Sequence, residues 1–417
     1  MDLRQRKRNK QLAQQVNSPF AAKKGKDWKL ALLVTAGILL VAGGVVGAAL
    51  LGWLNIPGLT PHNSGNVTPG EAMPDTKIHI IAGGDLNVTD KSVAAGEREN
   101  GYEYSGVFLD VMPVLSGGDM TLLNFEGNLC GQPYGSTYSS APQQMVEALR
   151  NAGVDILQTA NSKTITGGLL GMSATISGIR SAGMEALGSY ANSAEFDRYG
   201  GYLIREIQGI KVAFVAFTKG MDGRGLPEGN ENCVNLLYTD YASTYQKVDE
   251  SRITRILRAA KAQKPDIIIA MLHWGSEFND QISSTQKKIT TILQNEGVDA
   301  IIGTHPHYVQ KMSLDASSGQ FIAYSLGDFF GDAEKAGTNY SVLLDLEITK
   351  NGRTGEVKIT NYSYTPIFTA YEENGARILR IREAMTAYEK GSLGRVSQET
   401  YEAMKNALER IESRVKG

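Results

Sequence analysis

The chain has 417 residues, with 42 Lys or Arg against 44 Asp or Glu and a formal net charge of −2. Nine of the basic residues lie in residues 1–29, which leaves 33 basic and 42 acidic residues in the rest of the chain. The large part is therefore mildly acidic, and its charge gives no electrostatic case for binding nucleic acid.

The first 54 residues have the pattern of a membrane anchor. Residues Leu30 to Leu54 form a run of 25 residues without any charge. At about 1.5 Å per residue, a helix of this run exceeds the roughly 30 Å hydrocarbon core of a bilayer. A cleaved signal peptide would have an apolar region of only about 7–15 residues, so we expect an uncleaved anchor. The basic residues before the run place the N-terminus in the cytoplasm and the main domain outside the cell.

This pattern predicts a single-pass protein of the cell membrane with five parts. Pro, Gly, Asn and Ser in the segment after the anchor are typical of a tether. The remaining residues are enough for one large domain or two small ones with ample core. The predicted parts are a cytoplasmic tail (1–29), the anchor (30–54), a tether (55–75), an α/β domain (76–370) and a C-terminal helical extension (371–417).

Strand-like and helix-like segments alternate after the tether, which indicates an α/β protein. The expected strands are Ile78–Ala82, Thr121–Leu123, Asp155–Thr159, Lys211–Phe217, Asp266–Leu272, Val298–Ile302 and Phe321–Ser325, followed by a hairpin of 340–349 and Gly355–Tyr364. The expected helices are Pro142–Ala152, Leu169–Ala182, Arg252–Ala262 and Ser284–Asn295, with two charged surface helices at Ala376–Tyr388 and Gln398–Val415.

Four of these strands are followed by residues that can bind a cation. Since ligands of α/β sheets bind beyond the carboxyl ends of the strands, we expect these residues to converge. Carboxylates and imidazoles together suit Zn²⁺, Mn²⁺ or Fe²⁺. The candidate metal ligands are Asp85, Glu126, His273, His305 and His307.

Other interpretations of the histidines remain open. His305 and His307, two positions apart on an extended segment, would point their rings the same way, but His305-Pro306-His307 also fits a turn chosen for backbone shape. His273 beside Trp274 also fits a buried, hydrogen-bonded histidine. His62 in the tether and His79 within a strand are not candidates.

Six motifs in order resemble the bacterial CapA (PgsA-type) capsule-synthesis family, across Lys77 to Phe368. They are Gly84-Asp85, Asn124-Phe125-Glu126-Gly127, Ala160-Asn161, Leu272-His273-Trp274-Gly275, Gly303-Thr304-His305-Pro306-His307 and Tyr324-Ser325-Leu326-Gly327-Asp328-Phe329. The resemblance implies a calcineurin-like metallophosphoesterase fold, a two-sheet αββα sandwich flanked by helices. It also implies a role in making or exporting poly-γ-glutamate at the cell surface.

The resemblance also assigns roles and partners. It places the five candidate ligands around one or two divalent cations. We further expect Asn124, Asn161 and Asp328 to bind substrate. The implied partners are membrane subunits of a polymer-synthesis complex and an anionic polymer.

One motif departs from the family pattern. Where the family usually has Ala-Asn-Asn-His followed shortly by Asp, this chain has Ala160-Asn161-Ser162-Lys163 and then Thr166. A protonated Ser hydroxyl is a poor ligand, and a Lys ammonium cannot accept a proton. Lys163 could instead hold a phosphate or carboxylate as a point charge. Asp328, commonly Asn in the family, could pair with Lys163 or simply form a turn.

Two classes of function follow. In one, the domain is a surface metal-dependent phosphoesterase, hydrolase or transferase with Lys163 as a candidate catalytic residue. In the other, catalysis has decayed and the domain binds polymer or partner subunits. Because losing one preorganised donor typically costs about 10²–10³ in rate, we expect the family role with a partly degenerate site. Cys130 and Cys233 could form a disulfide or remain thiols.

Overall fold

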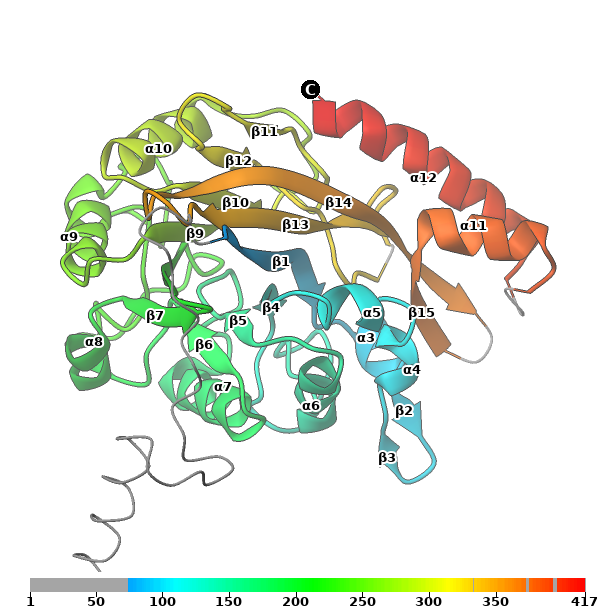
Figure 1. Cartoon of the computed structure of the whole chain (residues 1–417). Coiled ribbons are helices and arrows are strands. Elements are labelled where there is room, and N and C mark those ends of the chain that lie inside the picture. Colours follow the sequence, from blue (N-terminus) through cyan, green and yellow to red (C-terminus); the bar gives the residue numbers. More distant parts are fainter. Residues whose placement is uncertain (1–73, 333, 373–374, 393–395, 417) are drawn as a thin grey trace, which may run out of the picture. The chain divides into compact units, whose positions relative to one another are not determined.

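The computed structural model describes residues 74–332, 334–372, 375–392 and 396–416 (Figure 1). The predicted tail, the predicted anchor at 30–54, His62 and all but two residues of the tether lie outside these ranges. Within these ranges no helix is both long and apolar enough to cross a bilayer.

Two large sheets form the centre of the described part (Figure 1). The seven-stranded sheet has the order β15-β14-β13-β1-β4-β5-β6, and the six-stranded sheet has the order β11-β12-β10-β9-β8-β7. The first consists of β1 (Thr76–Asn87), β4 (Met120–Glu126), β5 (Ile156–Gln158), β6 (Glu185–Leu187), β13 (Tyr340–Lys350), β14 (Val357–Glu372) and β15 (Gly375–Arg380). The second consists of β7 (Tyr202–Ile207), β8 (Ile210–Thr218), β9 (Ile267–His273), β10 (Ala300–Thr304), β11 (Met312–Leu314) and β12 (Phe321–Ala323).

The central strands of each sheet run parallel. Strand β1 is parallel to β4 and antiparallel to β13, while β8, β9, β10 and β12 are mutually parallel. The carboxyl ends of the parallel strands therefore meet at one edge of each sheet. A small hairpin, β2 (Glu97–Arg98) with β3 (Gly101–Tyr102), lies apart from both sheets.

The helices connect the strands. They are α3 (Asp90–Ala94), α4 (Ser105–Phe108), α5 (Met112–Leu115), α6 (Gln143–Asn151), α7 (Gly168–Ser181), α8 (Ser193–Tyr199), α9 (Glu250–Lys261), α10 (Ser284–Asn295), α11 (Ile381–Glu389) and α12 (Gln398–Lys416). Helix α10 begins at Ser284 because the Ser283 hydroxyl accepts from the Gln286 backbone N–H in a capping box. The four interior helices predicted from the sequence are confirmed within two residues at each end.

Alternating strand residues build three apolar layers, because successive side chains of a strand point to opposite faces. In β4, Leu122 packs into the core between the sheets, whereas Leu123 packs outward with Leu149 of α6. In the second sheet Val215 packs outward with Ile256 of α9. The result is the helix–sheet–sheet–helix sandwich that the family resemblance implies.

The region after residue 370 differs from the prediction. Residues 375–380 form strand β15 rather than the start of a helix, because Ala376 and Ile378 face one side and Leu379 faces the core between the sheets. Six residues that alternate between two faces form a short pattern. Because helix α11 follows directly, the sequence favours one continuous helix. Helix α12 is amphipathic and buries Met404, Ala407, Ile411 and Val415 in the same core.

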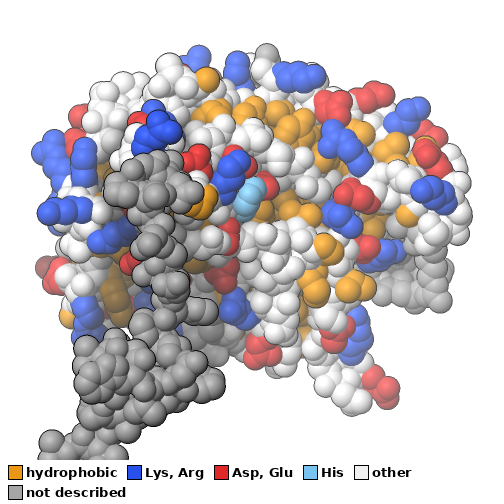
Figure 2. Space-filling view, in the orientation of Figure 1, with side chains coloured by type: hydrophobic (Ala, Val, Ile, Leu, Met, Phe, Trp, Pro, Cys, Tyr) orange, Lys and Arg blue, Asp and Glu red, His pale blue; other side chains and the backbone are white. Residues whose placement is uncertain are grey.

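Both cysteines are free thiols. Cys233 is buried and Cys130 is partly exposed, so of the two sequence-based alternatives the structure contains the unbridged one. Figure 2 shows basic and acidic side chains interspersed over one face of the described part.

Candidate metal centre

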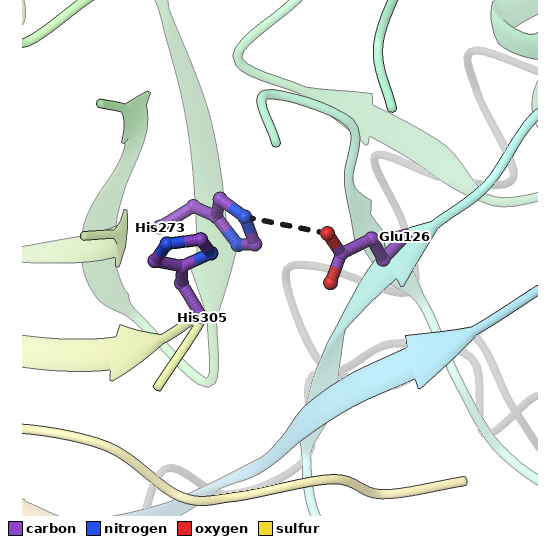
Figure 3. Close-up of side chains that lie close together, drawn as sticks. All are labelled: Glu126, His273 and His305. Carbon is purple, nitrogen blue, oxygen red and sulfur yellow. Dashed lines mark ion pairs between the residues drawn. The ribbon is translucent and has the colours of Figure 1, made fainter. Parts of the chain in front are cut away.

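Side chains from both sheets converge at the carboxyl ends of the parallel strands. Asp85 lies near the end of β1, Glu126 ends β4, His273 ends β9 and His305 directly follows β10. Figure 3 shows Glu126, His273 and His305 facing one another. All five predicted metal ligands, including His307, are at least nine-tenths buried.

The ring of His273 lies at the centre of the cluster. Its Nε2 is 3.5 Å from Glu126 Oε1 and 2.9 Å from the Ser162 hydroxyl. Its Nδ1 is 3.2 Å from Thr304 Oγ1 and 3.7 Å from Asp85 Oδ1. The interpretation of His273 as a buried, hydrogen-bonded residue is therefore correct for its contacts, and it does not conflict with a ligand role.

Asp85 connects the two halves of the site. Its carboxylate accepts hydrogen bonds from Asn124 Nδ2 (2.5 Å) and from the backbone N–H of His305 (2.8 Å). Burial acts to raise the pKa of Asp85, but the hydrogen bond and charge of His273 and the charge of His307 outweigh it, so this pKa is lowered. Asp85 is thus held as a carboxylate.

The position of Asp85 depends on a close backbone approach. The backbone N–H of Asp85 donates to Gly327 O at 3.0 Å. A Cβ atom at Gly84 would lie 1.7 Å from that same oxygen, so only glycine fits there. The register between β1 and β4 also shifts between Ala82 and Asp85. The Gly-Gly-Asp sequence therefore sets where the carboxylate is presented.

The His305-Pro306-His307 segment is a turn, and the prediction of an extended segment is wrong. His305 has φ 90° and His307 has φ 59°, both in the left-handed region. The turn aims the His305 backbone N–H at Asp85. The two ring centroids are 6.0 Å apart with an interplanar angle of 52°, so the rings face different groups.

The side chains form groups that fit a divalent cation. In two triads, Glu126/His273/His305 and Asp85/His307/Asp328, one potential ligand atom from each residue lies within 4.8 Å of the others. Glu126 Oε2 and His305 Nδ1 are buried and have no hydrogen-bond partner among the described residues. Because buried polar atoms are normally paired, these two atoms fit a bound cation. The carboxylate and imidazole donors suit Zn²⁺, Mn²⁺ or Fe²⁺.

Burial and neighbouring charges shift the pKa values of Glu126 and His305 in opposite directions. Burial and the nearby Asp85 raise the pKa of Glu126. Burial and the nearby His273 and Lys219 hold the pKa of His305 well below its usual range. A site with a neutral His305 keeps an imidazole lone pair available as a ligand.

Asp328 pairs with His307, so the alternative in which Asp328 pairs with Lys163 is wrong. His307 Nδ1 lies 2.7 Å from Asp328 Oδ1. Burial raises the pKa of Asp328 to about 7, while the charge of Asp328 overcomes burial to raise the pKa of His307. The Lys163 ammonium instead lies 2.6 Å from Asp222 Oδ2. These partners come from different loops, and no local sequence pattern relates them.

Asn124 and Asn161 are completely buried. Asn161 Nδ2 donates to Asn124 Oδ1 (3.1 Å) and to Phe125 O (2.7 Å), and Asn161 Oδ1 accepts from the Lys163 backbone N–H (3.0 Å). The structure thus gives these amides a role in holding the 160–163 loop against β4. Their predicted contact with substrate stays a prediction.

Four further polar residues lie at the site and were missed from the sequence: Lys219, Asp222, Glu277 and Thr304. Lys219 directly follows β8, and Thr304 ends β10, so the same strand-end rule could have found both. Asp222 and Glu277 lie in loops, where nothing in the sequence marks them. Lys219 Nζ is 3.2 Å from His305 Nε2.

Two pockets open beside the cluster. One, of about 390 Å³, is lined by Glu126, His307 and Asp328, with the exposed Phe278 also in its wall. The other, of about 270 Å³, is lined by Ser162, Lys219 and His305. The larger pocket thus reaches members of both triads, whereas the smaller one reaches His305 of the first triad.

This arrangement defines an α/β sandwich protein whose strand ends bring a carboxylate–histidine cluster into two adjoining pockets. Residues 79–333 match the family model described as "Bacterial capsule synthesis protein PGA_cap", and the chain belongs to this family. The matched segment contains all five predicted ligands and Asp328.

Two relatives have similar descriptions. The chain is 24% identical over 262 residues to "PGA biosynthesis protein CapA" of Bacillus subtilis (strain 168), covering 61% of this chain and 64% of that protein, which is less than two thirds of it. It is 24% identical over 322 residues to "Capsule biosynthesis protein CapA" of Bacillus anthracis, covering 74% of each.

Solved structures show weaker likeness. A calcineurin-like phosphoesterase YfkN from Bacillus subtilis has a TM-score of 0.42 and 17% identity, covering 82% of this chain and 98% of that one. A hypothetical protein from Thermus thermophilus has a TM-score of 0.40 and 14% identity, covering 69% of this chain and 99% of that one. At these TM-scores neither likeness carries an argument about this chain.

Proposed function

We propose that the chain is a CapA-like protein that acts in the synthesis or export of a capsule polymer of the poly-γ-glutamate type. The observation that carries this proposal is the family match over residues 79–333, since that segment holds the whole carboxylate–histidine cluster. The names of the two Bacillus relatives, which refer to capsule and PGA biosynthesis, support the same role.

The cluster supports a metal-dependent site in this role. Glu126, His273 and His305 would hold one divalent cation, and Asp85, His307 and Asp328 offer a second set of donors. Such a cation supplies a Lewis acid that polarises a phosphoryl or carbonyl oxygen and activates water. Asp85 stays ionised and positions the His305 turn through its backbone hydrogen bond.

The 160–163 loop supports a site that is partly degenerate. Burial acts to lower the pKa of Lys163, but Glu126 and Asp222 outweigh it and raise this pKa, so Lys163 is a cation and not a base. The Ser162 hydroxyl forms a hydrogen bond with His273 Nε2, at the position where the family has an asparagine amide as a metal ligand. The domain would then bind polymer or partner subunits as an accessory part of a membrane synthesis complex.

An active phosphoesterase or hydrolase that acts on a cell-surface substrate is the second candidate. Glu126 Oε2 and His305 Nδ1 favour it, because these two buried atoms have no hydrogen-bond partner among the described residues and so stay available to a cation. The two candidates differ in whether turnover, rather than binding alone, depends on the site.

Deleting the gene should remove surface γ-glutamyl polymer, and returning the wild-type gene should restore it. We expect the gene with Glu126→Gln to restore at least about tenfold less surface polymer than the wild-type gene. The substitution removes a carboxylate donor without changing the shape of the side chain. Glu409→Gln on the exposed face of α12 is the matched control and should behave as wild type. Polymer measured by acid hydrolysis of washed cells is the readout.

Each outcome has a distinct meaning. A deletion strain with normal surface polymer would overturn the proposed role. Full restoration by Glu126→Gln would show that the role does not need the metal centre, which would leave only the binding function.

We further propose that the domain is held outside the cell by the uncharged run from Leu30 to Leu54. Protease added to intact cells should then remove the large domain while a cytosolic marker survives. A mature form beginning after Leu54, or a domain protected together with the marker, would contradict this topology. The sequence argument for the anchor supports this expectation.

A further inference from the structure

Lys219 is a cation at the site, and no carboxylate of the described residues lies within ion-pair distance of it. Its Nζ donates to Gly275 O at 2.9 Å, lies 3.2 Å from His305 Nε2 and is 4.8 Å from the ring centre of Tyr245. Within the part of the chain that the structure describes, Lys219 forms no ion pair. By contrast, the neighbouring Lys163 has its own carboxylate in Asp222, at 2.6 Å. A partly buried ammonium in a pocket, without a counter-ion, is a natural place for a bound anion.

The contact between Lys219 and His305 cannot coexist with a cation on His305. A neutral imidazole has one lone pair and one N–H. A cation bound through Nε2 would use the lone pair that accepts from Lys219. A cation bound through Nδ1 would leave a proton on Nε2, which would then face the ammonium. In either case Lys219 must leave His305 for the adjoining space.

That space is the pocket of about 270 Å³, which Lys219 lines together with Ser162, Ser276, Asp222, Glu277 and His305. The charge of Asp222 is already matched by Lys163, whereas Glu277 is exposed and opposes an anion. The positive and negative charges around the pocket are thus nearly equal. A divalent cation bound at the cluster would make the net charge positive, which favours a bound anion. Hydroxyl donors from Ser162 and Ser276 add to this.

We propose that Lys219 binds an oxyanion group of the substrate, a phosphate or a carboxylate, in this pocket, and that a divalent cation on His305 releases it to do so. The proposal rests on the metal centre of the proposed function. It makes the binding of cation and anion cooperative, and it assigns the cooperativity to one side chain.

The test measures Mn²⁺ and inorganic phosphate binding to the full chain by calorimetry. Lys219→Met keeps the apolar stem but removes the charge. We expect phosphate binding at saturating Mn²⁺ to weaken by about tenfold or more, since a hydrogen bond to a charged group is lost. Mn²⁺ should bind severalfold more tightly, because its competitor for His305 is gone. Lys288→Met, an exposed position on α10, is the control and should match wild type in both.

A merely structural role for Lys219 would weaken both ligands together, so the opposite signs are diagnostic. Unchanged phosphate affinity in Lys219→Met, weaker Mn²⁺ binding in that variant, or no phosphate binding by wild type would overturn the proposal. If wild type binds no Mn²⁺, the metal centre fails. Phosphate binding that still depends on Lys219 would then support the oxyanion site alone, and binding independent of Lys219 would overturn it. Repeating the titration with glutarate separates a carboxylate from a phosphate ligand.

Discussion

Replacing Glu126 by Gln and His305 by Ala in one protein is expected to abolish metal binding while leaving the fold intact. These residues contribute two of three donors in one triad. Glu126 Oε2 and His305 Nδ1 have no hydrogen-bond partner among the described residues, so the variant removes only the polar contacts of Glu126 Oε1 with His273 and of His305 Nε2 with Lys219. The backbone N–H of His305 can still donate to Asp85. Metal affinity should fall by more than about 100-fold. Elemental analysis after dialysis against Mn²⁺ or Zn²⁺ measures it.

The matched control changes the same residue types away from the cluster. His79 of β1 pairs with Asp345 of β13, and Glu409 lies on the exposed face of α12. The double variant His79→Ala with Glu409→Gln should retain wild-type metal content. Equal metal in both double variants, or none in wild type, would show that the cluster is not a metal centre. Thermal unfolding curves close to wild type would show that lost metal does not reflect lost structure.

Gly84→Ala is expected to cause the largest loss of stability of any single methyl addition at the site. The new Cβ would lie 1.7 Å from Gly327 O, a backbone atom that cannot rotate away. The chain would have to shift and break the Asp85 to Gly327 hydrogen bond. We expect the free energy of unfolding to fall by about 3 kcal/mol or more, at the upper end of overpacking effects. Urea denaturation followed by circular dichroism measures it.

Gly106→Ala provides the comparison. A Cβ at Gly106 in α4 would meet no atom within 4 Å, and alanine favours a helix by up to about 1 kcal/mol. The free energy of unfolding should therefore stay the same or rise slightly. Similar losses in the two variants would mean that the close approach at Gly84 does not hold the site together.

The strand-end residues could be predicted because their position follows from a local pattern. A hydrophobic run followed by Asp85, Glu126 or His273 is visible in the sequence, and parallel strands bring such ends together. The same rule extends to Lys219, which follows β8 and lies at His305. The alternation of strands with amphipathic helices predicted only the α/β class, whereas the two-sheet sandwich was expected from the family resemblance.

The remaining features depend on long-range contacts that a local pattern does not contain. The turn at His305 and His307 needs positive φ at two non-glycine residues, which the sequence does not signal. Asp328 lies beside His307 and Lys163 beside Asp222 because loops from different strands meet. Strand β15 resembles a helix in the sequence since its six residues carry too short a pattern to compete with the helix beside them.

The family match and the sheet have different boundaries, and this matters for making the protein. The matched segment ends at residue 333, but β13 pairs with residues 76–82 of β1, with Ile80 opposite Leu346. A fragment trimmed to residues 79–333 would leave β1 as an unpaired edge and would uncover the apolar surface that Ile411 and Val415 close. Exposed, unpaired strand edges promote aggregation. The homologous segment thus carries the chemistry, whereas a soluble recombinant domain has to extend to the end of α12.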